Sequence, residues 1–190
     1  MTTKGIQVLR ADERPATPWL NGGGVTREVA GFPAGAGLGG FDWRVSLADV
    51  ASAGPFSPFP GIDRVITLVE GAGMALTVDG VEQVIDAPFH PFPFPGDATT
   101  DCRLLDGPVV DFNVMTRRGR VEAAVDLHTA PGTVPVPSAA TVLLVCLAGS
   151  ATVSGARLTR YDAVLLDAPG SHELRPDGVT VAITFRTPTH

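Results

Sequence analysis

The side chains best suited to bind a small molecule gather in the first 120 residues of this chain. Residues 18–28 place Asn21, Gly22 and Gly23 just before Thr26 and Arg27, beside a tryptophan. Consecutive glycines let the backbone adopt positive φ and approach another group closely, because no Cβ is in the way. The segment therefore predicts the wall of a binding pocket, although an ordinary tight turn uses the same residue types.

Two further segments add charged and polar groups. Arg44 and Ser46 alternate with apolar side chains along one predicted strand, and Asp111 and Asn113 share one face of another. Side chains two positions apart on a strand point to the same side of the sheet. A guanidinium fork matches a carboxylate, while amide and hydroxyl groups orient it. The combination predicts a site for a small, polar, anionic ligand.

The candidate ligand-binding residues carry polar or aromatic side chains, or a glycine backbone: Asn21, Gly22, Gly23, Thr26, Arg27, Trp43, Arg44, Ser46, Phe59, Arg64, Asp111 and Asn113. Arg44 and Arg64 would bind the carboxylate of the ligand, and Trp43 and Phe59 would form the walls. Thr26, Arg27 and Asp111 are second choices. The structural alternative is that the arginines form ion pairs with nearby aspartates and that the rings belong to the core.

Residues for metal binding or catalysis are sparse. The four histidines form no His-x-His pair, whereas a bound metal ion needs several imidazoles or carboxylates that converge on one point. We therefore expect no metal and no cofactor. A serine nucleophile would lack a histidine base. If the protein is an enzyme, Asp63 and Asp111 are the candidates for a general acid–base pair.

Composition excludes several classes of function. The net charge is −6, with no cluster of Lys and Arg, which argues against binding to nucleic acid. No apolar run reaches membrane-spanning length and the N-terminus lacks a signal-peptide pattern, so we expect a cytoplasmic protein with no membrane partner. Cys102 and Cys146 lie in apolar segments and are expected to be buried free thiols.

The elements that must position the candidate residues are strands. Runs rich in β-branched and aromatic residues, bounded by Gly, Pro or Asp, occupy residues 43–47, 65–69, 74–78, 109–115, 142–147 and 179–185. Asp79-Gly80, Ser154-Gly155, Asp106-Gly107 and Asp177-Gly178 predict short turns. Helical periodicity is weak throughout, so the chain is predicted to be all-β.

The order of strands and turns occurs twice. A strand, a turn at Glu70-Gly71 and a second strand in the first half match a strand, a turn at Ala148-Gly149 and a second strand in the second half. Two copies of one unit predict a bicupin, in which two jelly-roll halves pack into a single compact unit.

The two predicted halves differ in their polar content. Residues 179–185 carry Thr and Ala where residues 109–115 carry Asp and Asn. We therefore expect residues 1–120 to form an N-terminal half with the binding site and residues 138–190 to form a C-terminal half that serves as scaffold. Residues 121–137 are rich in proline and predict a linker that cannot join a central sheet.

Four segments together resemble the HutD/Ves family. They are Trp19-Leu20-Asn21-Gly22-Gly23-Gly24-Val25-Thr26-Arg27-Glu28, residues 41–49, Pro55-Phe56-Ser57-Pro58-Phe59-Pro60-Gly61-Ile62-Asp63-Arg64, and Asp111-Phe112-Asn113-Val114-Met115-Thr116-Arg117-Arg118-Gly119. The resemblance runs from about residue 6 to residue 118. It implies a bacterial double-cupin protein that is associated with histidine utilisation.

From the residues and the resemblance together, we expect a metal-free bicupin that binds a small carboxylate metabolite in a sensing or regulatory role. The resemblance implies an intermediate of histidine degradation, such as urocanate, formiminoglutamate or formylglutamate. A second hypothesis is a cofactor-independent isomerase or hydrolase that acts on a similar acid. A third is an interaction module whose second half forms a homodimer interface.

Overall fold

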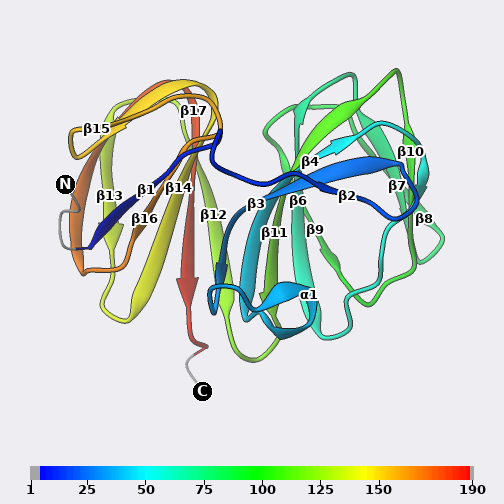
Figure 1. Cartoon of the computed structure of the whole chain (residues 1–190), viewed down its shortest axis with the longest axis horizontal. Helices are drawn as coiled ribbons and strands as arrows, with labels where there is room; N and C mark the ends of the chain where they lie inside the picture. The colour runs from blue at the N-terminus through cyan, green and yellow to red at the C-terminus, as the bar shows by residue number, and fades with distance from the viewer. Residues whose placement is uncertain (1–4, 189–190) are drawn as a thin grey trace. The chain divides into compact units, whose positions relative to one another are not determined.

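The chain is all-β, as its sequence predicts. A computed structural model describes residues 5–188, which form strands β1 to β17 and one helix, α1 (Gly37–Gly40) (Figure 1). The helix described in this range has four residues, far fewer than a membrane-spanning helix requires. The chain divides into two compact units, one of residues 15–120 and one that joins the residues up to 14 to those from 121 onward.

The unit of residues 15–120 contains two antiparallel sheets. The first has the order β2 (Thr17–Pro18), β3 (Gly24–Phe32), β4 (Trp43–Val50), β11 (Val109–Arg117), β6 (Ile62–Glu70) and β9 (Pro91–Pro95). The second has the order β5 (Gly54–Pro55), β10 (Thr100–Leu104), β7 (Met74–Val78) and β8 (Val81–Ile85). One apolar cluster joins Ile66 and Leu68 of the first sheet to Met74 and Leu76 of the second. The inner faces of the two sheets therefore pack against each other.

The other unit is built on one sheet. Its order is β1 (Ile6–Leu9), β16 (Ala163–Leu166), β14 (Ala140–Val153), β17 (Gly170–Arg186) and β12 (Glu122–His128). Two more strands join it, β13 (Gly132–Val136) on β17 and β15 (Ala156–Leu158) on β14. Its core includes Val142, Leu144, Val164 and Leu174. Because β1 pairs with β16, the first strand of the chain belongs to the same unit as the last.

The segment predicted to be a linker is part of this sheet. Residues 121–137 contain β12, which pairs with β17 along its whole length, and β13, in which Pro135 lies opposite Ser171. A proline is tolerated there because β13 pairs only with β17 among the described strands, so its other edge needs no N–H donor. Residues 121–137 thus contribute two strands to the sheet instead of a separate linker, and Pro135 lies on an edge strand of that sheet.

Two predicted turns also lie inside strands. Asp79-Gly80 and Ser154-Gly155 do form hairpin turns with positive φ. In contrast, Gly149 and Gly178 lie opposite each other in the continuous strands β14 and β17, next to a bulge in β14. The glycines are needed for close contact between the two strands, since a Cβ on Gly149 would lie 1.9 Å from the carbonyl oxygen of Asp177.

Candidate functional site

The polar candidates meet on one face of the six-stranded sheet. On the central strand β11, Met115 lies opposite Arg44 of β4 on one side and Arg64 of β6 on the other. Asn113 lies opposite Ser46. Directly opposed side chains point to the same face of a sheet. The alternation predicted from the sequence therefore brings two arginines, an amide and a hydroxyl side by side.

This face is the interior face of the unit. Arg64, Ile66 and Leu68 occupy every second position of β6, so their side chains point to the same face. Ile66 and Leu68 belong to the apolar core between the two sheets. Asp111 lies opposite Leu68, and it is only 2% exposed. The polar row thus replaces apolar packing in one part of the interior, as expected for a binding site rather than for a core.

Arg64 is a buried cation enclosed by aromatic rings. It is 7% exposed, and its guanidinium carbon lies 4.8 Å from the ring centre of Phe94, 5.3 Å from Phe56 and 5.6 Å from Phe59. Burial lowers its pKa to about 10, against the raising effect of Asp111, so it stays protonated at neutral pH. Its Nε has no hydrogen-bond partner in the described part of the chain.

Asp111 and Asn113 present unpaired acceptors to the same interior. Burial raises the pKa of Asp111 to about 7, although the charge of Arg64 opposes this rise. One carboxylate oxygen of Asp111 (Oδ1) and the side-chain oxygen of Asn113 are buried and, within residues 5–188, accept no hydrogen bond. Buried polar atoms are nearly always paired in folded proteins. A bound water or a ligand can supply the missing partners of these two oxygens and of Arg64 Nε.

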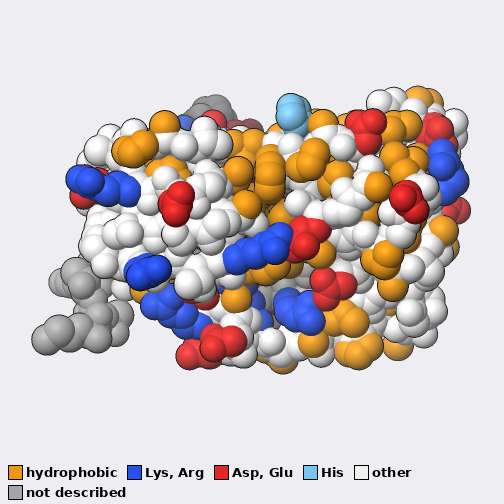
Figure 2. Space-filling view, turned by 90° about the horizontal axis from the view of Figure 1, so that it is seen from above, with side chains coloured by type: hydrophobic (Ala, Val, Ile, Leu, Met, Phe, Trp, Pro, Cys, Tyr) orange, Lys and Arg blue, Asp and Glu red, His pale blue; other side chains and the backbone are white. Residues whose placement is uncertain are grey.

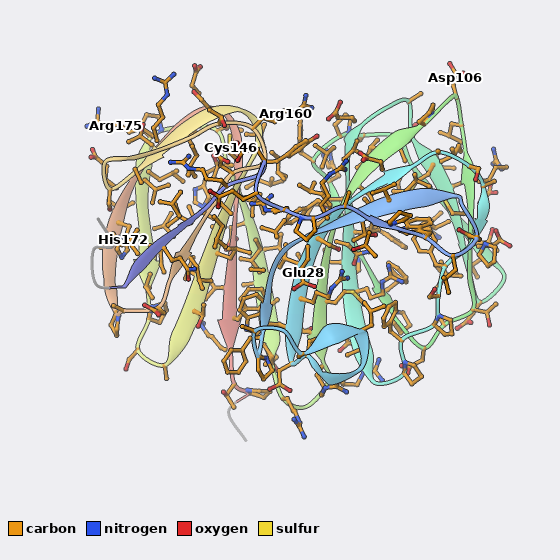
Figure 3. The ribbon with its side chains drawn as sticks, viewed as in Figure 1. Glu28, Asp106, Cys146, Arg160, His172 and Arg175 are labelled. Carbon is orange, nitrogen blue, oxygen red and sulfur yellow. The ribbon has the colours of Figure 1, made fainter. Side chains whose placement is uncertain are left out.

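A small pocket opens beside this interior. It is a shallow depression with room for about one water molecule, and is lined by Glu28, Gly31, Pro33, Ala36, Gly37, Phe41 and Arg44. Arg44 Nε donates to a carboxylate oxygen of Glu28 at 2.7 Å. Glu28 is on β3 (Figure 3), and 46% of its side chain is exposed, against 12% for Arg44. The ion pair thus lies between solvent and the buried row.

The glycine turn has a structural role in this fold. The side-chain oxygen of Asn21 accepts a hydrogen bond from the Gly23 N–H at 3.0 Å, which is the usual bond of an Asx turn. Trp19 Nε1 donates to Thr26 Oγ1 at 2.7 Å, and a Cβ on Gly24 would lie 3.1 Å from the Trp19 ring. Gly22 is exposed. The turn therefore holds Trp19, whose ring packs edge-on against Phe56 with ring centres 6.4 Å apart, and Asn21 has a structural role in this turn.

Two other predicted site residues point to the opposite face of the sheet. Trp43 alternates with Arg44 and stacks on Phe32, with ring centres 6.5 Å apart. Arg27 forms an ion pair with Asp49. Of the two proposed walls, only Phe59 contacts the buried arginine.

The predicted acid–base pair is not assembled. Asp63 is exposed and accepts hydrogen bonds from Arg118 at 2.6 and 2.9 Å, whereas Asp111 is buried on the interior face. Asp63 is adjacent to Arg64 in β6, and neighbouring residues of a strand point to opposite faces. The pairing of Asp63 with Asp111 as catalytic groups is therefore wrong on geometric grounds.

Three residues of the site were missed from the sequence: Glu28, Phe56 and Phe94. Glu28 is two positions after Thr26 on a predicted strand, so the sequence could have predicted that the two side chains share a face. Its pairing with Arg44 depends on a bulge in β3 between Glu28 and Ala30, and the local sequence does not predict this bulge. Phe94 reaches Arg64 because β9 pairs with β6, a long-range pairing that the spacing of Phe and Pro does not reveal.

The other unit has fewer buried polar atoms without a hydrogen-bond partner among its described residues. Its buried polar atoms without a hydrogen-bond partner, within the described residues, are Arg14 Nε and Thr180 Oγ1. The other guanidinium nitrogens of Arg14 donate to the carbonyl oxygens of Tyr161 and Leu9 at 2.6 and 3.2 Å. Arg14 therefore ties the first strand to the loop before β16, and the described residues of this unit form no row of unpaired groups like that around Arg64.

The described residues do not form a metal site. No group of three or more His, Cys, Asp or Glu side chains in residues 5–188 is placed to hold an ion. Many surface charges are instead paired with each other, such as Arg103 with Glu82 and Arg175 with Glu173. On the face drawn in Figure 2, Lys and Arg side chains are interspersed with Asp and Glu side chains.

Distant solved structures share the fold. Quercetin 2,3-dioxygenase from Acinetobacter baumannii matches 97% of this chain and 80% of its own, with a TM-score of 0.65 and 16% identity. The protein YhhW from Escherichia coli matches 97% of this chain and 98% of its own, with a TM-score of 0.71 and 10% identity. At such low identity these likenesses establish a cupin-like fold and nothing about activity.

Closer relatives share sequence as well. A 21.2 kDa protein in the hutC 3' region of Pseudomonas putida is 41% identical over 175 residues, which cover 89% of this chain and 90% of the relative. Protein Ves from Citrobacter koseri is 42% identical over 114 residues, 58% of each chain. HutD from Pseudomonas fluorescens has a structure with a TM-score of 0.87 and 36% identity, covering 97% of this chain and 100% of its own. The HutD family model matches residues 11–183, and the chain therefore belongs to the HutD family.

Proposed function

We propose that this protein is a cytoplasmic bicupin that binds a small carboxylate metabolite inside the unit of residues 15–120, in a sensing or regulatory role. The observation that carries the proposal is Arg64, a buried cation with an unpaired Nε. The family, and the relative in the hutC region of Pseudomonas putida, favour an intermediate of histidine degradation. Urocanate, formiminoglutamate and formylglutamate are the first candidates.

The energetics of Arg64 support an anionic ligand. A buried charge without a partner is costly, because the protein interior solvates it poorly. Its three phenylalanine neighbours offset part of this cost, since each cation–π contact contributes about 0.5–2 kcal/mol. The rings provide no hydrogen-bond acceptor for Nε. A carboxylate would supply that acceptor and the compensating charge, and a guanidinium can bind it through two parallel hydrogen bonds.

We place the entrance of the site at the pocket between Glu28 and Arg44. Phe41 lines this pocket and packs in the same apolar cluster as Met115, the residue between Arg44 and Arg64 on the sheet. Arg44 also lies close enough to Arg64 to lower its pKa. An incoming acid would meet Arg44 first and then pass to Arg64, which would be its final partner.

The proposal is tested by thermal shift with urocanate, formiminoglutamate, formylglutamate and formate, the last because the HutD structure from Pseudomonas fluorescens comes from a formate condition. A ligand at 100 times its dissociation constant adds about 2.7 kcal/mol to the free energy of unfolding. We expect one of these acids to raise the melting temperature of the wild type, with or without EDTA, and to leave that of Arg64→Met unchanged.

The matched control is Arg103→Met, which removes an exposed arginine of the same unit. This variant should respond to the acid as the wild type does. If no acid shifts the wild type, or if Arg64→Met responds fully, the proposed site is wrong.

A second candidate function, that of an isomerase or hydrolase acting on a similar acid, is favoured by one observation. The pKa of Asp111, about 7, suits a group that takes up and releases a proton near neutral pH. An enzyme of this kind would convert the bound acid, and Asp111→Asn would reduce turnover by about 100-fold or more. A binding protein would leave the acid unchanged. NMR spectra of the acid, recorded over hours in the presence of the protein, distinguish the two outcomes.

A further inference from the structure

The four-stranded sheet of the unit of residues 15–120 ends in an exposed strand. β8 pairs with β7 on one side, and no other described strand pairs with its second side. Four of its five residues are exposed, among them Val81 at 59% and Val84 at 54%. The free side of such a strand presents N–H and C=O groups to which another strand can bind.

The other three end strands of the two sheets in this unit carry proline. β2 contains Pro18, β5 contains Pro55, and β9 has proline at positions 91, 93 and 95. Proline has no N–H to donate, and its presence on an edge strand prevents the addition of another strand. β8 has the sequence Val-Glu-Gln-Val-Ile, without proline. Among the described edges of this unit, β8 is therefore the best suited to receive another strand.

The hairpin turn before β8 fixes which of its backbone groups are free. Both residues of the turn Asp79-Gly80 have positive φ, 47° and 83°, which is typical of a type I′ turn. The pair that flanks such a turn, Val78 with Val81, is hydrogen-bonded, and every second pair after it is hydrogen-bonded as well. The N–H and C=O groups of Glu82 and Val84 therefore point away from β7, and within the described residues no backbone hydrogen bond reaches them.

One register between two copies of the chain pairs all of these free groups. An antiparallel contact with its two-fold axis at Gln83 places Glu82 opposite Val84 of the second copy, and Val84 opposite Glu82 of the second copy. Each of these pairs exchanges both of its N–H···O bonds. The two Gln83 side chains meet on the axis, where one amide can donate to the other.

The charges of β8 favour the same register. Glu82 pairs with Arg103 of its own copy at 3.2 Å, so its charge is balanced before a second copy arrives. With the axis at Glu82, two glutamates would lie opposite each other, and with the axis at Val84, Glu82 would lie opposite Asp86. Like charges directly opposite each other destabilise a strand pair. With the axis at Gln83, Glu82 lies opposite a valine instead.

We infer that β8 is a homodimer interface, at which two copies of the chain join their four-stranded sheets into one antiparallel sheet across a two-fold axis at Gln83. The inference involves no ligand, so it stands or falls separately from the acid site. A contact between two short strands buries less surface than the about 800 Å² per partner of a stable complex, so we expect a weak dimer, with a Kd of about 100 µM.

The first test is sedimentation velocity of the full-length protein, at concentrations from about 10-fold below this Kd to about 10-fold above it. The wild type should pass from monomer to dimer over this range. Val84→Glu places a carboxylate opposite Glu82 of the second copy and should weaken the dimer at least about 10-fold. Leu20→Glu is the matched control, because Leu20 is a fully exposed apolar residue in the turn before β3, and it should associate as the wild type does.

The second test is of the register. Directly opposite residues of a non-hydrogen-bonded antiparallel pair have Cα atoms about 4.5 Å apart, within the range that a disulfide spans. Gln83→Cys should therefore give a covalent dimer under mild oxidation, as followed by non-reducing electrophoresis. Glu82→Cys, whose position lies opposite Val84 of the second copy, should give at least about 5-fold less. The native Cys102 and Cys146 are buried and should not contribute.

Three results would overturn the inference. The first is a wild type that stays monomeric at the highest concentration, with no covalent dimer of Gln83→Cys. The second is equal association of Val84→Glu and Leu20→Glu, which would place the dimer contact elsewhere on the chain. The third is equal crosslinking of Gln83→Cys and Glu82→Cys, as random collisions would produce.

Discussion

At the scale of single residues, the interior of the unit of residues 15–120 contains an arginine and an aspartate that do not form an ion pair. Arg64 and Asp111 influence each other's pKa, yet no ion pair joins them among those found in the described residues. Each retains an unpaired atom. Two ionisable groups that are buried but not joined are poor for stability and useful for binding, because a ligand can bridge them.

The raised pKa of Asp111 predicts how the stability of the protein depends on pH. The folded state holds this proton more tightly, with a pKa of about 7 against an ordinary value of 3.8. The stabilising contribution is therefore complete below about pH 4 and is lost as the pH rises through 7. Asp111→Asn removes this loss, so its free energy of unfolding relative to wild type should rise by about 2.6 kcal/mol between pH 5 and pH 8.

Urea unfolding of both proteins at these two pH values measures the change. Groups other than Asp111 titrate in both proteins, so their effects cancel in the difference. A difference between the proteins that stays constant from pH 5 to pH 8 would show that Asp111 is not held protonated by burial.

In the proposed site, Glu28 would compete with the ligand for Arg44. Its carboxylate occupies the arginine at 2.7 Å, so Glu28→Gln should free the guanidinium and tighten the binding of a small acid about 3- to 10-fold. One factor of ten corresponds to about 1.4 kcal/mol. Asp49→Asn is the matched control, because it breaks the Arg27–Asp49 ion pair on the other face of the sheet. Weaker binding by Glu28→Gln would mean that Glu28 itself holds the ligand.

At the scale of elements, pairing between strands decides which residues meet. The six strand segments predicted from the sequence all lie within strands of the structure. Runs of β-branched residues bounded by Gly, Pro and Asp favour strands over helices. Their partners could not be predicted. Phe94 reaches Arg64 only through the pairing of β9 with β6, and this pairing leaves no trace in the local sequence.

Within the site, alternation along a strand predicted the common face of Arg44 and Ser46 and that of Asp111 and Asn113. It could not exclude Asn21, whose amide completes a turn. The turns predicted at Gly149 and Gly178 were wrong for a different reason. These glycines lie inside the long strands β14 and β17, where they allow close contact between the two strands. A glycine in a sequence cannot reveal whether it is needed for its φ angle alone or for lack of a side chain.

This contact between strands can be tested by substitution. Gly149 has φ 73° and would place a Cβ 1.9 Å from a backbone oxygen of β17, so Gly149→Ala must shift one of the strands. We expect it to lower the free energy of unfolding by about 3 kcal/mol. Gly132→Ala, at a site with no atom within 4 Å of the added Cβ, should change it by less than about 0.5 kcal/mol. Equal effects of the two substitutions would contradict the strand contact.

At the scale of the whole molecule, each unit buries one cysteine. Burial raises the pKa of the Cys102 thiol to about 12 and that of the Cys146 thiol to about 11, and both residues are almost fully inaccessible (Cys146 is labelled in Figure 3). Because the thiolate is the reactive form, neither should react with Ellman's reagent at pH 8 in the native protein. In urea, each should react only when its own unit unfolds.

The two thiols therefore report on the two units separately. Cys102→Ala and Cys146→Ala each leave one reporter, and a difference in their urea midpoints would show that the units unfold independently. Rapid reaction of either thiol without denaturant would contradict the packing described around it.

The most direct measurement of the central claim is a crystal structure of the protein with urocanate or N-formylglutamate. The predicted result is a carboxylate within about 3 Å of the Arg64 guanidinium. A ligand bound elsewhere, with Arg64 still surrounded only by Phe56, Phe59 and Phe94, would contradict the account.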